Sequence, residues 1–211
     1  MPPLHLEVLT PQAKTLWPRL PEFGDDYYLA GGTALALQLN HRQSFDFDLF
    51  SKNPIPRNQL VKVEKIFTGD IVTPSTNNRD ELTVLIRGVK CSFIHYPFPL
   101  LFPLLNEEGL QLLSAHEIAA TKAYTIGRRG AWKDYIDLYA CLTTGVTTLE
   151  QVIGDAQKKY ADVFNDRLFL EQLVYLDDLD DTQGLREKTK HTPGELQAFF
   201  KKAIADLHLA K

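Results

Sequence analysis

The amino-acid sequence predicts an α+β fold, in which a mixed sheet flanked by helices is followed by a C-terminal helical bundle. Before residue 106, short runs rich in β-branched and aromatic residues alternate with turns, whereas long amphipathic patterns dominate after it. The 211 residues, 44% of them hydrophobic and 24% charged, suffice for one large or two small globular domains. We therefore expect two domains, over residues 1–106 and 107–211.

The N-terminal half is predicted to alternate between helices and strands. Pro21 closes a short helix and Gly88 turns a hairpin. Alternating apolar and polar residues indicate the strand that follows the second helix. In order, the expected elements are a helix over 12–20, a strand over 27–30, a helix from Thr33, a strand over 45–50, a helix over 58–67, a strand over 70–74, and two strands over 82–87 and 89–96.

The C-terminal half is predicted to be helical. Gly130 separates the first two helices, and Pro193 occupies the favoured first turn of the last. An acidic run, Asp177–Asp181, follows the fourth helix and is typical of a solvated helix end. The expected helices span 114–127, 131–143, 148–160, 164–176 and 193–209.

Composition and charge exclude several classes of protein. Lys and Arg number 23 against 27 Asp and Glu, and the net charge of −4 argues against a surface coated with basic residues for nucleic-acid binding. Cys91 and Cys141 are too few for a disulfide scaffold, so we expect two buried thiols. The N-terminus lacks a signal-peptide pattern, and three prolines interrupt the apolar stretch 94–105, so we expect a cytoplasmic protein without a membrane partner.

A pair of aspartates in the strand over 45–50 is the first chemical motif. Asp46 and Asp48 are two residues apart, so in a strand they project side by side. Parallel carboxylates repel each other unless a cation intervenes, and Mg²⁺ prefers such oxygen ligands. Alone, the pattern is typical of a solvated strand face. The positions expected to face the core instead are Phe45, Phe47 and Leu49.

Gly31 and Gly32 form the second motif, directly after a strand. Without Cβ atoms they let a phosphate approach the backbone, and the helix that starts near Thr33 adds free N–H groups and a hydroxyl. Alone, a Gly-Gly pair is typical of a plain turn. With one helix between them, the two motifs together predict a phosphate cradle beside a metal site.

Five longer motifs resemble a known family. They run, in order, from Gly31 to Leu37, from His41 to Ser51, from Gly88 to Pro97, from Ile118 to Lys122 and from Gly127 to Tyr139, with a weaker run from Leu173 to Asp178. Through them, residues 20–205 resemble the AbiEii/AbiGii-type nucleotidyltransferases, a branch of the DNA-polymerase-β-like superfamily that includes toxins of toxin–antitoxin pairs. The resemblance implies a nucleotidyltransferase-like catalytic domain over 1–106 and a helical domain over 107–211 that completes the cleft.

The implied activity is transfer of a nucleoside monophosphate from an NTP to an acceptor hydroxyl, on an RNA end or a protein side chain. Two Mg²⁺ ions would be held by Asp46 and Asp48, and the triphosphate by Gly31, Gly32 and Thr33. An antitoxin protein is the further partner that the resemblance implies. The alternative, which belongs to a different class of function, is a catalytically inactive module with the same fold that binds an NTP or a partner.

The resemblance also assigns residues outside the two motifs. Ser92 stands where related enzymes commonly place a third carboxylate, and Asp137 is the candidate to replace it. Lys122 would neutralise phosphate charge, although a solvated helix lysine is the alternative. Asp137 is expected to face Lys122 or the metals as a catalytic residue, with a buried structural ion pair as the alternative. Asp134 suits the first turn of its helix.

A basic loop precedes that helix and is the predicted acceptor-binding segment. Arg128, Arg129 and Lys133, with Trp132 among them, could hold a nucleic acid through phosphate contacts and stacking. Equally, they could complement a helix end and pack a tryptophan. The loop also leaves open a third function, an RNA-binding accessory protein. Arg42, before the aspartate strand, is expected to bind a nucleotide phosphate as an arginine fork.

Overall fold

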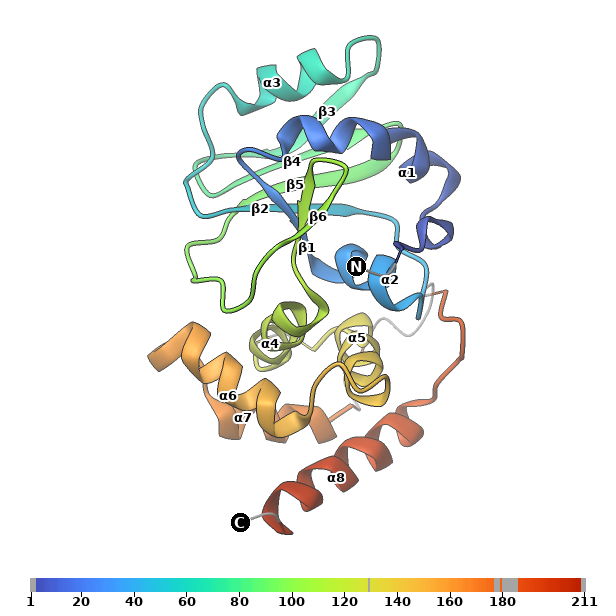
Figure 1. Ribbon diagram of the computed structural model, residues 1–211, viewed down its shortest axis with the longest axis vertical. Coiled ribbons are helices and arrows are strands. Elements are labelled where there is room, and N and C mark those ends of the chain that lie inside the picture. The colour runs from blue at the N-terminus through green and yellow to red at the C-terminus, as the bar shows by residue number, and fades with distance from the viewer. Residues whose placement is uncertain (1–2, 129, 177–178, 180–185, 210–211) are drawn as a thin grey trace. The chain divides into compact units, whose positions relative to one another are not determined.

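The computed structural model describes residues 3–128, 130–176, 179 and 186–209 and divides the chain into two units (Figure 1). The sheet unit comprises residues 1–38, Gln43–Pro99 and Pro103–Ser114. The helical unit comprises Leu39–Arg42, Leu100–Phe102 and the chain from Ala115 onward. The sheet unit continues past residue 106, where the composition of the sequence changes, because the hairpin that follows belongs to the sheet.

The sheet unit contains one seven-stranded mixed sheet, which confirms the predicted fold class. Its strand order is β3-β4-β5-β2-β1-β7-β6. Strands β1 and β7 are parallel, as are β2 and β5, and the other neighbours are antiparallel. The strands are β1 (Tyr28–Ala30), β2 (Phe47–Ser51), β3 (Val72–Asn77), β4 (Glu81–Ile86), β5 (Val89–His95), β6 (Leu105–Glu107) and β7 (Leu110–Leu112). The helices are η1 (Leu6–Val8), α1 (Pro11–Leu16), η2 (Trp17–Phe23), α2 (Gly31–Leu39) and α3 (Gln59–Ile66).

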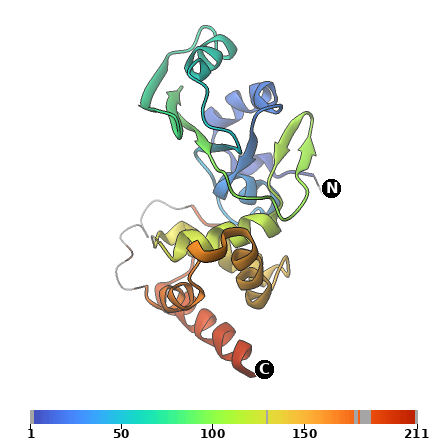
Figure 2. The same cartoon turned by 90° about the vertical axis from the view of Figure 1, so that its left-hand side faces the viewer.

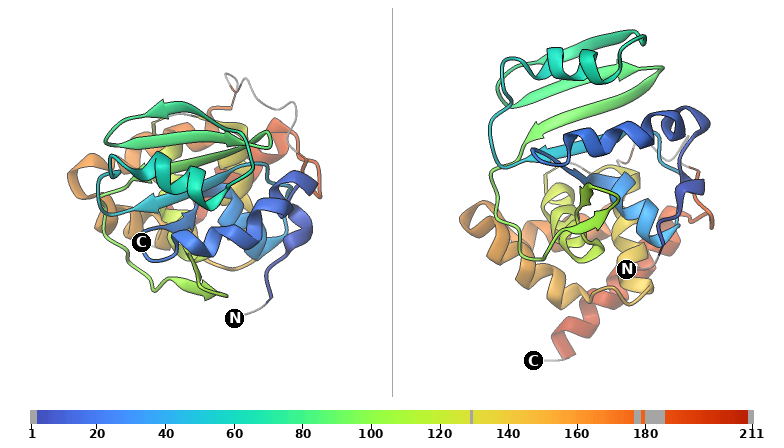
Figure 3. Two further views of the ribbon diagram at one scale, coloured as in Figure 1. Left: turned by 90° about the horizontal axis from the view of Figure 1, so that it is seen from above. Right: turned by 45° about the horizontal axis from the view of Figure 1, so that its top comes forward.

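Aromatic side chains build the core between the sheet and the helices α1 and α3, which lie on the same face of the sheet (Figure 3). The Phe23 ring packs 4.9 Å from the Phe93 ring and 6.4 Å from that of Phe67, and Trp17 lies 6.4 Å from Phe47, all between ring centroids. Side chains alternate along a strand, so the residues beside Phe47 and Phe93 face the other side of the sheet. Asp48, which lies between Phe47 and Leu49 in β2, is on that other face.

The aspartate strand is shorter than predicted. Phe45 does not face the core: it is 38% exposed, and β2 begins only at Phe47, which is fully buried. The amide of Ser44 donates to the Val8 carbonyl at 2.9 Å, and Thr33 donates to the carbonyl of Asp46. These contacts with residues distant in sequence fix the segment before β2, which does not form the ladder of hydrogen bonds that a neighbouring strand would provide.

Three smaller differences have local causes. The predicted helix over 12–20 is an α-helix followed by a 3₁₀ helix that contains Pro18 and Pro21, which cannot donate to a regular helical ladder. The predicted strand over 70–74 is β3, shifted to Val72–Asn77. The hairpin of β6 and β7 was not predicted, because three-residue strands leave too little pattern; it turns at Glu108 and Gly109, both with positive φ.

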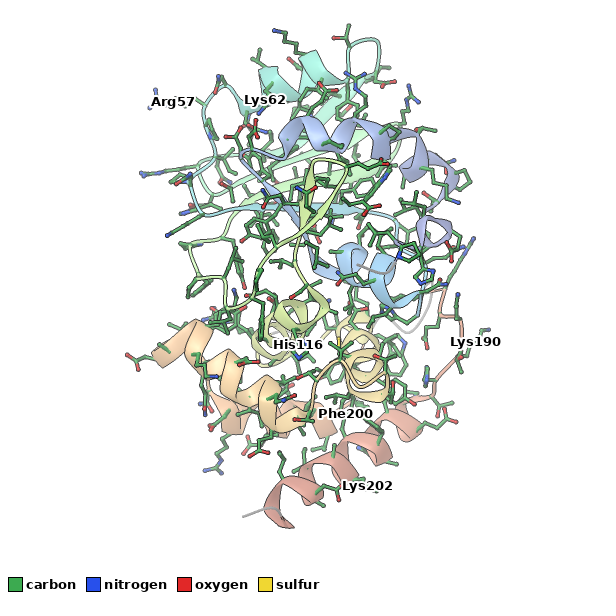
Figure 4. The ribbon with its side chains drawn as sticks, in the orientation of Figure 1. Arg57, Lys62, His116, Lys190, Phe200 and Lys202 are labelled. Carbon is green, nitrogen blue, oxygen red and sulfur yellow. The ribbon has the colours of Figure 1, made fainter. Side chains whose placement is uncertain are left out.

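Among its described residues, the helical unit contains the five α-helices that the sequence predicts. They are α4 (Ala115–Ile126), α5 (Trp132–Thr143), α6 (Leu149–Tyr160), α7 (Asp166–Val174) and α8 (Pro193–Leu209), with the short η3 (Ala161–Val163) after α6. Helix α4 packs against α5, α6 and α7 (Figure 2). Helix α8 directs the buried Phe200 inward, 6.2 Å from Tyr135 between centroids, and the exposed Lys202 outward (Figure 4).

Two expectations about the chain as a whole can be compared with these units. Cys91 and Cys141 are both buried free thiols, as predicted. In the part of the chain that the structure describes, no helix is both long and apolar enough to cross a membrane.

Candidate functional site

The two predicted motifs touch each other in the sheet unit. Ala30 at the end of β1 is the register partner of Asp48 on β2. The next residue, Gly31, has a φ of +64°, and a Cβ built on it would lie 2.6 Å from Oδ2 of Asp48. Glycine is therefore required here both by the backbone and by the carboxylate. Because α2 begins at Gly31, the free N–H groups of its first turn lie beside Asp48.

Thr33 fixes the segment that carries the first aspartate. Its hydroxyl is buried and donates to the backbone carbonyl of Asp46. Because that hydroxyl has a single proton, the 2.6 Å contact between Thr33 Oγ1 and Ser44 Oγ is a bond in which Ser44 donates. The contacts of Thr33 are therefore with the protein, and direct binding of a triphosphate by its hydroxyl stays a prediction.

The two carboxylates sit at the start of β2 and are open to solvent to different degrees. Asp48 lies in β2 and is half-buried, whereas Asp46 precedes the strand and its side chain is 40% exposed. Burial, together with the charges of Asp46 and Asp48, raises the pKa of the Cys91 thiol on β5 to about 12. Both carboxylates therefore act on the same neighbouring strand.

Lys90 is a residue that the sequence analysis did not single out. Its Nζ lies 3.6 Å from Oδ2 of Asp46, and both side chains are partly exposed. Phe47 pairs with Cys91 on the parallel strand β5, which brings the preceding residues, Asp46 and Lys90, together. Only the register between β2 and β5 would have identified Lys90 as a neighbour of Asp46, and that register is not known until the fold is known.

Ser92 lies directly beside the second aspartate. It is the register partner of Asp48 on β5, is 4% exposed, and its Oγ is 2.9 Å from Oγ1 of Thr83 on β4. A neutral hydroxyl therefore occupies the position next to Asp48 at which related enzymes are expected to place a third carboxylate.

The donor set in the sheet unit fits a hard divalent cation. Asp46 and Asp48 supply carboxylate oxygens, and Mg²⁺ usually takes only one or two carboxylates, with waters and substrate phosphates completing its coordination. The glycine at 31 keeps Oδ2 of Asp48 clear of a side chain. Within the described residues, no cluster of three or more His, Cys, Asp or Glu side chains is arranged to hold a metal ion without such a substrate.

The helical unit contains a buried network of charges around Asp137. Oδ1 of this fully buried carboxylate accepts from His41 Nε2 and Arg42 Nε, each at 2.7 Å. Oδ2 accepts from Arg42 Nη2 at 3.0 Å and from Lys122 Nζ at 2.6 Å. Lys122 also donates to Oδ1 of Asp134 at 2.7 Å. The predicted pairing of Asp137 with Lys122 is confirmed.

The charges of this network favour the ionised forms of Asp137 and Lys122. Burial alone would raise the pKa of Asp137, but the charges of Arg42 and Lys122 and the hydrogen bonds from His41 and Arg42 hold it well below its usual value. Burial alone would lower the pKa of Lys122, but the carboxylates of Asp137 and Asp134 raise it. A buried positive charge on Lys122 is therefore permanent near neutral pH.

The predicted site residues thus fall into two groups. Gly31, Thr33, Asp46 and Asp48 meet in the sheet unit, and Arg42, Lys122 and Asp137 meet in the helical unit. Arg42 is buried against Asp137 rather than exposed in a loop. His41 and Asp134 complete the second group, and their distance in sequence from their partners hid these contacts.

The predicted acceptor-binding loop is partly described. The guanidinium of Arg128 lies 4.4 Å from the centroid of the Tyr124 ring, and Lys133 is exposed. Trp132 is buried, and its Nε1 donates to Oε1 of Glu187 at 2.9 Å, so this side chain packs within the protein. Arg129 lies outside the described residues, as do the four aspartates of the acidic run 177–181.

Comparison with solved structures shows that the chain has a nucleotidyltransferase-like α+β fold. The structures of JHP933 from Helicobacter pylori (TM-score 0.58, 16% identity, covering 98% of this chain and 96% of that one) and of MenT4, a nucleotidyltransferase toxin from Mycobacterium tuberculosis (TM-score 0.59, 16% identity, covering 90% and 80%), share it. An uncharacterized protein of Aquifex aeolicus is 31% identical over 184 residues, which are 86% of this chain and 88% of the relative.

The family follows from the sequence as a whole. The family described as "Nucleotidyl transferase AbiEii toxin, Type IV TA system" matches residues 58–209. The chain therefore belongs to the AbiEii nucleotidyltransferase toxin family, as the resemblance implied. The activity that describes this family is nucleotidyl transfer.

Proposed function

We propose that this chain transfers a nucleoside monophosphate from an NTP to an acceptor hydroxyl in the presence of Mg²⁺, and that it is the toxin of a pair whose antitoxin protein binds it. The observation that carries the proposal is the contact between Gly31 and Asp48. It joins a helix start that suits phosphate to a carboxylate that suits a metal, which are the two components that phosphoryl chemistry on a nucleotide requires.

Asp46 and Asp48 are the residues that would hold two Mg²⁺ ions, which when bound neutralise the triphosphate and lower the pKa of the acceptor hydroxyl. Gly31 and Gly32 let the triphosphate approach the first turn of α2. Thr33 acts by fixing the segment of Asp46. The acceptor oxygen attacks the α-phosphorus, the bond to pyrophosphate breaks, and the monophosphate is transferred.

Lys122, Arg42 and Asp137 enter the proposal as a charge network. Within the helical unit, Lys122 and Arg42 are the cations that we propose for neutralising phosphate charge, and Asp137 keeps them oriented. Both oxygens of Asp137 already accept bonds from three side chains, and the carboxylate is fully buried. These contacts support a positioning role for Asp137 over that of a metal ligand.

An RNA end is the acceptor that the basic loop favours over a protein hydroxyl. Arg128 and Lys133 are exposed cations on one segment, of the kind that contact the phosphates of a nucleic acid. The second candidate function, an NTP-binding or partner-binding module without transfer, is favoured by one observation only, the neutral Ser92 beside Asp48.

Two measurements test the proposal. Melting of the wild type is followed with each NTP, with and without Mg²⁺, beside Asp46→Asn/Asp48→Asn; an NTP at 100 times its Kd stabilises by about 2.7 kcal/mol. Transfer of label from α-³²P-NTPs to total bacterial RNA, and to bacterial protein, is then followed. Mg²⁺-dependent stabilisation and labelling by the wild type alone support the enzyme. Stabilisation without labelling supports the binding module, and neither effect contradicts both functions.

A further inference from the structure

A row of polar side chains crosses three strands on the face of the sheet opposite the aromatic core. Asp48 on β2 is the register partner of Ser92 on β5, and Ser92 is the register partner of Thr83 on β4. Register partners project to the same face of a sheet, here the face opposite Phe47 and Phe93. Ser92 and Thr83 are almost completely buried, at 4% and 5% exposure. The row therefore leads from the metal-binding carboxylate into the sheet.

The row ends on a carboxylate. Glu81 lies two residues before Thr83 on β4, so it shares the same face, and its Oε1 accepts a hydrogen bond from Thr83 Oγ1 at 2.5 Å. Thr83 Oγ1 also lies 2.9 Å from Ser92 Oγ. A threonine hydroxyl has one proton, and an ionised carboxylate only accepts. Thr83 therefore donates to Glu81 and accepts from Ser92, which leaves the lone pairs of Ser92 for a further donor.

The surroundings of Glu81 argue against a purely structural contact. Among the described residues, no Lys, Arg or His nitrogen forms an ion pair with Glu81, whose side chain is only half-buried. Such a side chain is able to extend into solvent, and the two buried hydroxyls would satisfy each other without it. Instead it is the end of a chain of aligned donors and acceptors that starts beside Asp48.

We propose that Glu81 receives, through Thr83 and Ser92, the proton that the acceptor hydroxyl loses during nucleotidyl transfer. The inference rests on the proposed function. As the acceptor oxygen bonds to the α-phosphorus and the bond to pyrophosphate breaks, its proton passes to Ser92 Oγ. The proton of Ser92 passes to Thr83, and that of Thr83 passes to Glu81. Ser92 is the group in contact with the acceptor, and Glu81 acts through it, so that a serine does the work of a carboxylate.

The test uses Glu81→Gln in the full-length chain, because a glutamine oxygen still accepts from Thr83 but does not take up a proton at neutral pH. We expect the rate of labelling of total bacterial RNA or protein by α-³²P-NTP at saturating NTP to fall about 10- to 100-fold. KM for the NTP and the thermal stabilisation by Mg²⁺–NTP stay within about twofold. Glu64→Gln, an exposed carboxylate on α3, is the matched control and should not change the rate.

Rescue by a carboxylate at position 92 separates the relay from a structural effect. Ser92→Asp places a proton acceptor directly beside Asp48, so adding Glu81→Gln to that variant should change the rate by less than about twofold. Thr83→Val should lose as much as Glu81→Gln, and the two together no more, because both break one chain.

The outcomes separate the relay from the function on which it rests. A Glu81→Gln variant as fast as the wild type refutes the relay alone, and so does an equal loss in the Ser92→Asp background. A wild type that labels neither acceptor refutes the proposed transfer and the relay together, and its stabilisation by Mg²⁺–NTP then indicates the binding module.

Discussion

Substituting Gly31 by alanine tests whether the two motifs act as one site. The new Cβ would lie 2.6 Å from Oδ2 of Asp48, so the carboxylate must move about 0.8 Å to reach ordinary contact at 3.4 Å. A misplacement of about 1 Å in a reacting constellation costs about 10²-fold. Alanine at positive φ also destabilises the fold, by about 1–2 kcal/mol. Gly31→Ala should therefore lose more affinity for Mg²⁺–NTP than its loss of stability accounts for.

Gly88→Ala is the matched control for Gly31→Ala. Gly88 has a φ of +79°, and a Cβ there meets no atom within 4 Å. Both variants therefore carry the same kind of backbone strain, but only one displaces Asp48. We expect urea unfolding to give similar losses of stability for both. Affinity for Mg²⁺–NTP, measured by thermal shift or titration calorimetry, should fall about 10- to 100-fold in Gly31→Ala only. Equal affinities in the two variants would show that Asp48 is not part of the nucleotide site.

Three further substitutions have expected outcomes. Asp137→Asn removes the buried negative charge that Arg42 and Lys122 share, and should lower the free energy of unfolding by about 3–5 kcal/mol in urea titrations. Folding lowers the pKa of Asp137, so the ionised carboxylate stabilises the protein above the pKa of the unfolded carboxyl, about 3.9, and this contribution is lost as pH falls through the lower folded value. The free energy of unfolding should therefore depend less steeply on pH in the acid range in Asp137→Asn than in the wild type. Thr33→Val removes the donor to the buried segment of Asp46 and should cost about 1–3 kcal/mol in the same titration, together with weaker Mg²⁺–NTP stabilisation. Lys159→Met removes the ammonium that pairs with the buried Glu117 carboxylate at 2.5 Å, and should lower the melting temperature by several degrees without changing the affinity for Mg²⁺–NTP in titration calorimetry.

The order of elements was predictable because it depends on local pattern. Periodic apolar residues placed all five helices of the helical unit, and Gly88 placed the hairpin of β4 and β5. The same hairpin determines its register: with the turn at Arg87 and Gly88, Thr83 must face Ser92. The row of hydroxyls that ends on Glu81 could therefore have been found from the sequence, had the pairing been counted outward from the turn.

Contacts between distant residues account for what the sequence did not predict. Phe45 alternates correctly for a core position, but the bonds of Ser44 and Asp46 to Val8 and Thr33 fix the segment outside the sheet. Alternation describes a strand only where neighbours supply the ladder.

The surroundings of Asp137 show the same limit more strongly. This carboxylate meets His41 and Arg42 across 96 and 95 residues, a separation at which no local period carries information. The sequence could therefore indicate that Asp137 needs a partner if buried, and it offered Lys122, but it could not supply the guanidinium and the imidazole.

The charges around each carboxylate bear on the roles that we propose for Asp46, Asp48 and Asp137. Asp137 is fully buried and accepts bonds from an arginine, a lysine and a histidine, so its charge is already compensated within the protein. A metal ion there would have to displace buried cations. Asp46 and Asp48 are partly exposed, and the ammonium of Lys90 stands 3.6 Å from Asp46. Carboxylates in this state can bind a divalent cation without breaking a buried network, which favours Asp46 and Asp48 over Asp137 for the proposed metal binding.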